Sequence, residues 1–141
     1  MSKNAQVLNF LKTRAEECDT GRRHYLAQMA SKLPEQPDVL SVDSSVGNFD
    51  LSVLLQNNEQ DLNRWVTQLT IYTSLHRIFS QKVEQFGSHA VTDMADWVQV
   101  VINDRIADLR PNIQSVSALQ AYARVLRFLK ACLEDTEQED A

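Results

Sequence analysis

Glycine and proline are scarce in this chain of 141 residues, with three of each. Strands and tight hairpins depend on these residues for their turns, so the scarcity favours helices. No apolar run reaches the length of about 18 residues that a membrane-spanning helix needs, and the first residues lack the uncharged apolar segment of a secretory signal. Cys18 and Cys132 are the only cysteines. These absences predict a protein with reduced thiols in the cytoplasm, with the nucleus as the alternative.

Sequence motifs for catalysis and for metal or phosphate binding are also missing. There is no Gly-x-Ser-x-Gly, no His-Glu-x-x-His and no glycine-rich phosphate loop. In helical bundles that hold two iron ions, a glutamate precedes each ligating histidine by three residues. Here the residues at that spacing are Gly21, Thr73 and Phe86. We therefore expect no enzyme activity, no cofactor and no metal ion.

The charge balance is acidic, with a net charge of −5. This balance argues against direct binding to a phosphate backbone. The carboxylates are concentrated at the end of the chain, where residues 134–141 hold five acids and no base. We expect one domain over residues 1–134 and a disordered acidic tail over 135–141.

The first 33 residues carry the spacing of an amphipathic helix. Apolar positions recur at steps of three and four from Leu8 to Met29, and the stripe keeps its register across Gly21. The pattern predicts one helix over about 4–33 that stops before Pro34. The alternative is two helices hinged at Gly21, because glycine costs on the order of 1 kcal/mol inside a helix.

Residues 34–50 read as a connecting loop, because they hold two of the three prolines, one glycine and three serines. A short helix over 51–56 is an option, followed by the polar run "QNNEQ" that interrupts the apolar pattern.

The strongest helix signal lies over about 59–86. Eight residues alternate strictly by three and four, in the manner of heptad positions: Leu62, Trp65, Leu69, Tyr72, His76, Phe79, Val83 and Phe86. Its apolar arc is broad enough to need neighbours on more than one side, so this helix should be central. Gly87 supplies a C-terminal stop.

Two shorter helices follow, over about 92–110 and 116–134. Thr92 is the expected N-cap of the first, and Ser115 or Ser117 that of the second. The four main helices predict an all-α antiparallel bundle. Its two long helices would project beyond the shorter pair, and their exposed ends would favour a partner or a second copy of the chain.

His76 is best interpreted as a packed histidine. No acid and no second histidine stands one helical turn away, since those positions hold Tyr72, Thr73, Phe79 and Ser80. Without such a neighbour the residue is neither a metal ligand nor a general base in this helix.

Arg105 and Arg22 fall inside the apolar stripes of their helices. Each has two interpretations. The stem of Arg105 could cover the core edge while its head pairs with Asp108, or the guanidinium could aim at an acid on a partner. Arg22 would need an ion partner if it were buried, or it marks where its helix leaves the core.

Phe128 points away from the stripe of its helix and lies alongside Arg124 and Arg127. An aromatic residue accompanied by two arginines is typical of an interface hot spot. The alternative is a second packed layer within the chain. We predict a non-enzymatic protein–protein interaction module, such as an adaptor, an assembly factor or a small subunit, with Arg22, Arg105, Arg124, Arg127 and Phe128 as its partner-binding residues. The other hypotheses are an acidic regulator that docks on a nucleic-acid-handling protein and an enzyme or metal-binding bundle.

Overall fold

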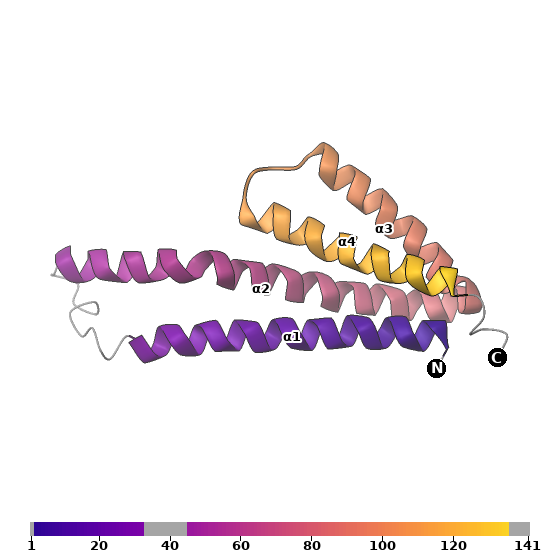
Figure 1. The fold of residues 1–141 in the computed structure, drawn as a ribbon, viewed down its shortest axis with the longest axis horizontal. Helices are drawn as coiled ribbons and strands as arrows, with labels where there is room; N and C mark the ends of the chain where they lie inside the picture. The colour runs from indigo at the N-terminus through magenta and orange to yellow at the C-terminus, as the bar shows by residue number, and fades with distance from the viewer. Residues whose placement is uncertain (1, 33–44, 136–141) are drawn as a thin grey trace.

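The computed structural model describes residues 2–32 and 45–135. It confirms the all-helical fold class. Consecutive helices run in opposite directions (Figure 1). They are α1 (Lys3–Lys32), α2 (Ser45–Phe86), the 3₁₀ turn η2 (Gly87–His89), α3 (Ala90–Ala107) and α4 (Ile113–Glu134). No helix in the part that the structure describes combines the length and the apolar character that a membrane span requires.

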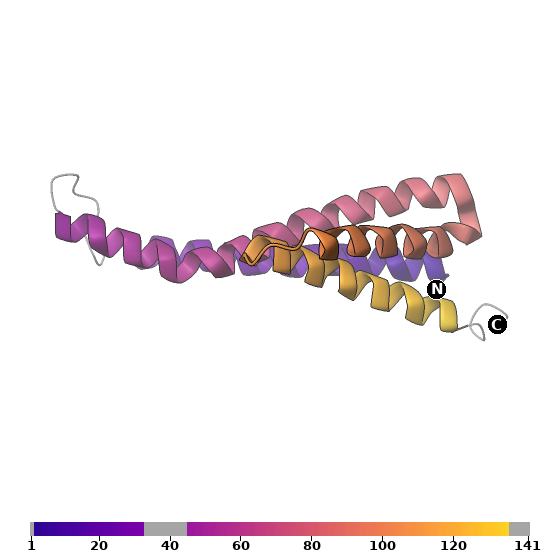
Figure 2. The ribbon, with the colours of Figure 1, turned by 90° about the horizontal axis from the view of Figure 1, so that it is seen from above.

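The long helices α1 and α2 form a hairpin, and the shorter pair α3 and α4 covers only one end of it (Figures 1 and 2). The projection predicted from the helix lengths is therefore present. Helix α2 has 42 residues and α3 has 18. At about 1.5 Å per residue, α2 is roughly twice as long as α3. One end of the molecule is thus a four-helix body, and the other end is a two-helix arm.

Helix α2 is the centre of the four-helix body, as its broad apolar arc predicts. It packs against α1, α3 and α4. Its Tyr72, Leu75 and Phe79 are at most 1% exposed and meet the inner faces of the other three helices. Those faces contribute Val7, Leu11, Met94, Val98, Val125 and Leu129. His76 lies beside this core and is half-buried.

The start of α2 differs from the prediction. The prediction of a loop over 34–50 is wrong for residues 45–50, because these residues are already part of α2. The separate short helix over 51–56 is also wrong, since α2 runs through it and through "QNNEQ" without a break. Glutamine and glutamate are good helix formers, so an interrupted apolar stripe does not by itself mark the end of a helix. Residues 34–44 lie outside the described part.

The boundaries of α3 and α4 differ from the prediction, and a capping bond accounts for the beginning of α4. Helix α3 spans Ala90–Ala107 instead of 92–110, and α4 begins at Ile113 instead of 116. Thr92 is not the N-cap; that position is His89, whose side chain makes no capping bond. Neither Ser115 nor Ser117 caps α4. Asn112 does, because its side-chain oxygen accepts a hydrogen bond from the Ser115 N–H at 2.8 Å, as asparagine commonly does.

Gly87 ends α2, as predicted. Its φ of 57° lies in the left-handed region, where a side chain is costly and glycine is not. The side-chain amide nitrogen of Asn4 donates a hydrogen bond to the Gly87 carbonyl oxygen at 3.0 Å. This bond ties the beginning of α1 to the turn between α2 and α3.

Candidate interaction site

Helices α1 and α4 pack side by side in opposite directions, and two contacts fix their register. The Cys132 thiol lies 3.9 Å from the Gln6 side-chain oxygen, and the rings of Phe10 and Phe128 stack with centroids 4.1 Å apart and planes 6° apart. Phe128 therefore has an aromatic partner within the chain. This contact is the second packed layer that was the alternative to a partner interface.

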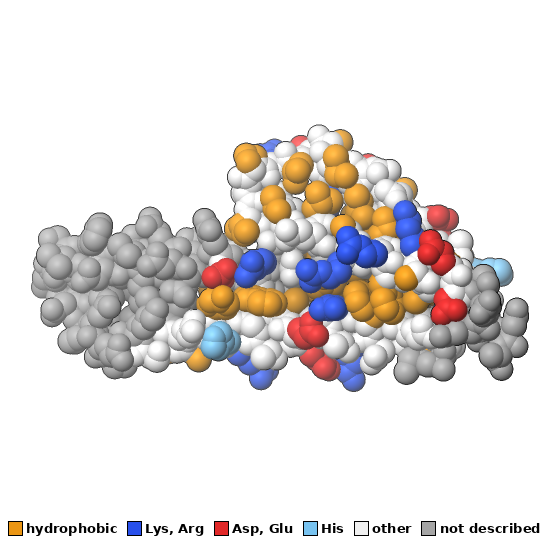
Figure 3. All heavy atoms as spheres, in the orientation of Figure 1, with side chains coloured by type: hydrophobic (Ala, Val, Ile, Leu, Met, Phe, Trp, Pro, Cys, Tyr) orange, Lys and Arg blue, Asp and Glu red, His pale blue; other side chains and the backbone are white. Residues whose placement is uncertain are grey.

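Basic side chains gather on the same face of the molecule (Figure 3). On each helix, an arginine lies four residues from the stacked phenylalanine on the side of the arm. These are Arg14 on α1, after Phe10, and Arg124 on α4, before Phe128. The positive charges of both arginines lower the pKa values of two buried groups, the Cys18 thiol and the Tyr72 phenol. Burial raises these pKa values, and its effect is the larger one. The face thus combines arginines with aromatic rings.

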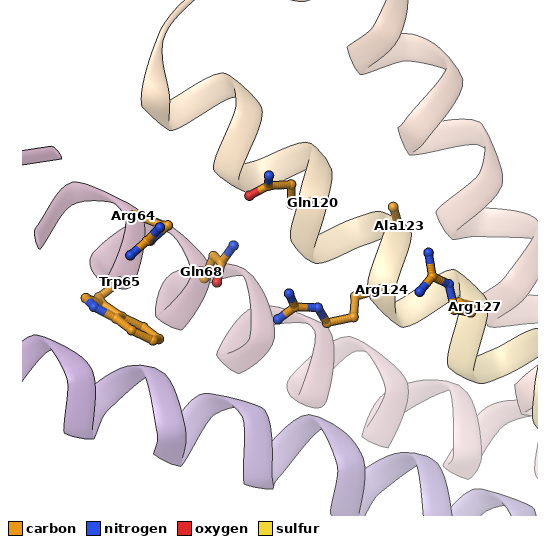
Figure 4. Close-up of a pocket in the computed structure, with 7 residues that line it drawn as sticks. All are labelled: Arg64, Trp65, Gln68, Gln120, Ala123, Arg124 and Arg127. Atoms are coloured by element: carbon orange, nitrogen blue, oxygen red, sulfur yellow. The ribbon is translucent and has the colours of Figure 1, made fainter. Parts of the chain in front are cut away.

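A groove of about 480 Å³ lies between α2 and α4 on this face. Arg64, Trp65 and Gln68 come from α2, whereas the other lining residues come from α4 (Figure 4). We call it the arginine groove; it is lined by Arg64, Trp65, Gln68, Gln120, Ala123, Arg124 and Arg127. None of these residues is acidic.

The three arginines of the groove differ in their ion pairs. Arg64 donates to Asp61 at 3.1 Å, one turn away on α2. Arg124 and Arg127 are exposed and form no ion pair within the described residues. Two arginines therefore lie one turn apart on α4 with no carboxylate partner in the part of the chain that the structure describes, in a protein whose net charge is −5.

Two lining residues of the groove, Gln68 and Trp65, contact neighbouring helices. Gln68 is only 5% exposed, and its amide nitrogen donates to the Ser117 carbonyl oxygen at 3.3 Å. This bond links α2 to α4. Trp65 packs against Gly21 of α1, and its ring Nε1–H is buried without an acceptor among the described residues. The Arg64 guanidinium lies 5.6 Å from the centre of the Trp65 ring.

Tyr72 lies behind Arg124 in the core. Its hydroxyl is buried and has no hydrogen-bond partner of normal geometry in the described part of the chain. Burial raises the pKa of this phenol, and the nearby Arg124 acts in the opposite direction. The phenol therefore keeps its proton at neutral pH.

The two thiols are buried. Burial raises the pKa of Cys18 from its usual value of 9.0 to about 11, and burial also raises the pKa of Cys132. Both thiols are protonated at neutral pH, whereas the thiolate is the reactive form. Among the side chains that the structure describes, no three histidine, cysteine or acidic groups lie close enough to hold a metal ion.

Arg105 and Arg22 lie away from the arginine groove. The Arg105 guanidinium sits 4.9 Å from the centre of the Tyr122 ring, so α3 and α4 share a cation–π contact. Asp108 is not the partner that the sequence suggested. Arg22 is half-buried and bonds to Asp19 at 2.7 Å, which supplies the ion partner that a buried arginine needs.

The structure thus brings together two of the five residues expected at an interface, Arg124 and Arg127. Phe128 lies on the neighbouring seam between α1 and α4. Sequence reasoning missed Arg64, Trp65 and Gln68. The pair Arg64–Trp65 has the same arginine–aromatic composition as the stretch around Phe128. This shared composition is the signal by which the sequence could have predicted that both stretches belong to one surface.

Comparison with known proteins finds no matching family, no matching curated protein and no matching solved structure.

Proposed function

We propose that this chain is a non-enzymatic protein–protein interaction module, acting as an adaptor, an assembly factor or a small subunit of a larger complex. The arginine groove is its partner-binding surface. The observation that supports this proposal is the pair Arg124 and Arg127, two exposed arginines that have no carboxylate partner among the described residues and line a groove without an acid. Arginine is enriched at the energetic centres of protein interfaces.

The neighbouring seam strengthens the proposal. The stacked rings of Phe10 and Phe128 line a second, smaller groove together with Arg14. A surface that alternates arginines with well-packed aromatic groups has the composition of an interface core. The proposed compartment is the cytoplasm, with no membrane and no cofactor. An acidic regulator, a metal-binding bundle and a homodimer stay predictions, without a described contact that favours them.

Affinity capture from the native cell tests the proposal. The baits are the full chain, the groove variant Arg124→Glu/Arg127→Glu and a control variant Lys12→Glu/Arg77→Glu. The control makes the same change in net charge on exposed residues outside the groove. We expect a partner that the full chain and the control retain and the groove variant loses.

Helical content and melting temperature of the three baits should agree, because all four substituted side chains are exposed. Identical partners with all three baits would refute the groove as the binding surface.

A further inference from the structure

The arginine groove offers anchors for carboxylates. We infer that it binds an acidic segment of a partner protein, with Arg124 and Arg127 each taking an Asp or Glu side chain; this inference rests on the proposed function. Both arginines lie on one side of α4, three residues apart, which places them one turn from each other. A segment that crosses α4 at the groove would therefore meet both guanidinium groups.

The chemistry of the guanidinium group favours this partner. Its planar fork matches a carboxylate through two parallel hydrogen bonds. The groove lining supplies donors and no acidic acceptor, and the described residues hold no carboxylate paired with Arg124 or Arg127, so both groups can accept one from a partner.

Arg64 has a different role in this arrangement. Its guanidinium already bonds to Asp61 at 3.1 Å, and both side chains are about 40% exposed, at 41% and 40%. A carboxylate from the partner must compete with Asp61 for Arg64. Arg124 and Arg127 are therefore the principal anchors, and Asp61 limits the affinity of the groove.

Nucleic acid is the other anionic macromolecule, and the described contacts argue against it. Single strands bind to proteins by stacking bases on open aromatic rings. The Trp65 ring is packed against Gly21 and also faces Arg64. The Phe10 ring is stacked on Phe128 and faces Arg14 at 5.4 Å. Both rings beside the arginines are thus already engaged.

Fluorescence titration tests the inference. The probe is a labelled peptide of alternating Glu and Ser residues, and the comparison probes are the Gln and Ser peptide and an oligothymidylate of the same length. We expect the full chain to bind the Glu peptide about tenfold more tightly than the Gln peptide, a difference of about 1.4 kcal/mol. Arg124→Glu/Arg127→Glu should abolish this preference, and Lys12→Glu/Arg77→Glu should keep it.

The sharpest test is Asp61→Asn, which frees Arg64 from its internal partner. We expect it to strengthen binding of the Glu peptide by about threefold. Glu84→Gln is the matched control, because it makes the same change in net charge at an exposed residue of α2 that forms no ion pair in the described part of the chain. That control should leave the affinity unchanged.

Three results would overturn the inference: equal affinity for the Glu and Gln peptides, no loss with Arg124→Glu/Arg127→Glu, or tighter binding of the oligothymidylate through the same arginines. The capture experiment separates these failures from failure of the proposed function. If capture still shows a partner that depends on Arg124 and Arg127, the groove is an interface and only the acidic chemistry is wrong.

Discussion

The indole ring of Trp65 lies directly against the backbone of Gly21, where an added Cβ would come within 2.5 Å of the ring. This contact brings α1 and α2 into close approach at the edge of the four-helix body. Helix α1 is continuous through Gly21, as the unbroken stripe predicted. The glycine therefore makes room for a neighbouring side chain and is not a hinge.

Gly21→Ala should destabilise the protein by about 1–3 kcal/mol, because the methyl group forces the indole ring to move. This outcome runs against helix propensity, by which alanine is favoured over glycine by about 1 kcal/mol. Urea denaturation measures the difference. In a Trp65→Ala background the ring is gone, and the same substitution should become stabilising. A gain in stability in the presence of Trp65 would show that the ring moves away at little cost.

Phe128→Ala should lower the free energy of unfolding by about 2 kcal/mol, because the side chain stacks on Phe10 and is half-buried. A double-mutant cycle with Phe10→Ala should give a coupling energy of about 1 kcal/mol. Phe86→Ala is the control, since Phe86 is 42% exposed and its loss should cost less. If Phe128→Ala left the stability unchanged, the stacking would contribute nothing to folding, and contact with a partner would be the remaining role of Phe128.

Ser117→Ala should stabilise the protein by about 1 kcal/mol. The Ser117 side chain is completely buried, and its hydroxyl has no hydrogen-bond partner in the described part of the chain. Removing a buried, unsatisfied hydroxyl removes a desolvation penalty. Ser80→Ala should give no such gain, because the Ser80 hydroxyl donates to the His76 carbonyl oxygen at 2.8 Å. Thermal unfolding of both variants gives the comparison, and a loss of stability in Ser117→Ala would contradict the expectation.

The protein should lose stability between pH 9 and pH 11. The pKa of Cys18 is about 11 in the folded protein and 9.0 for an ordinary thiol, so in this range the unfolded chain has lost a proton that the folded chain keeps. The unfolded state is thereby favoured, by up to about 1.4 kcal/mol per pH unit for this one group. Below pH 9 both states hold the proton, and the contribution of Cys18 is fully present.

The raised pKa of Tyr72 adds to this alkaline loss, in the same direction. Equilibrium denaturation at a series of pH values measures the slope. Cys18→Ala should show a smaller fall in stability between pH 9 and pH 11 than the unchanged chain, whatever its stability at neutral pH. Equal slopes would show that Cys18 is not the group responsible.

Periodicity predicted the helices well where they are buried. The stripe from Leu62 to Phe86 identified the central helix, and Gly87 marked its end, because burial and backbone conformation both leave a local trace in the sequence. The beginning of α2 was missed, since the residues before Leu62 carry no continuous apolar stripe. The N-cap of α4 was missed for a related reason: Asn112, Ser115 and Ser117 are all acceptable N-cap residues, and only the backbone path selects Asn112.

The arginine groove was predicted only in part. Arg124 and Arg127 stand out because they flank an aromatic residue off the helix stripe. Arg64 belongs to a different helix, and a stripe shows which face of a helix is buried without showing which helix covers it. The same limit applies to Phe128, whose partner Phe10 lies on α1. Contacts between residues far apart in the chain depend on the order and direction in which the helices pack.

The pairing of α1 with α4 also decides how the protein would respond to mechanical force. The N-terminal end of α1 and the C-terminal end of α4 lie at the same end of the molecule (Figure 1), joined by the contact between Gln6 and Cys132. A force applied between these two ends would separate the helices one turn after another from that end. It would not shear the helices along their axes. The stacked rings of Phe10 and Phe128 come next along that seam and would resist its opening.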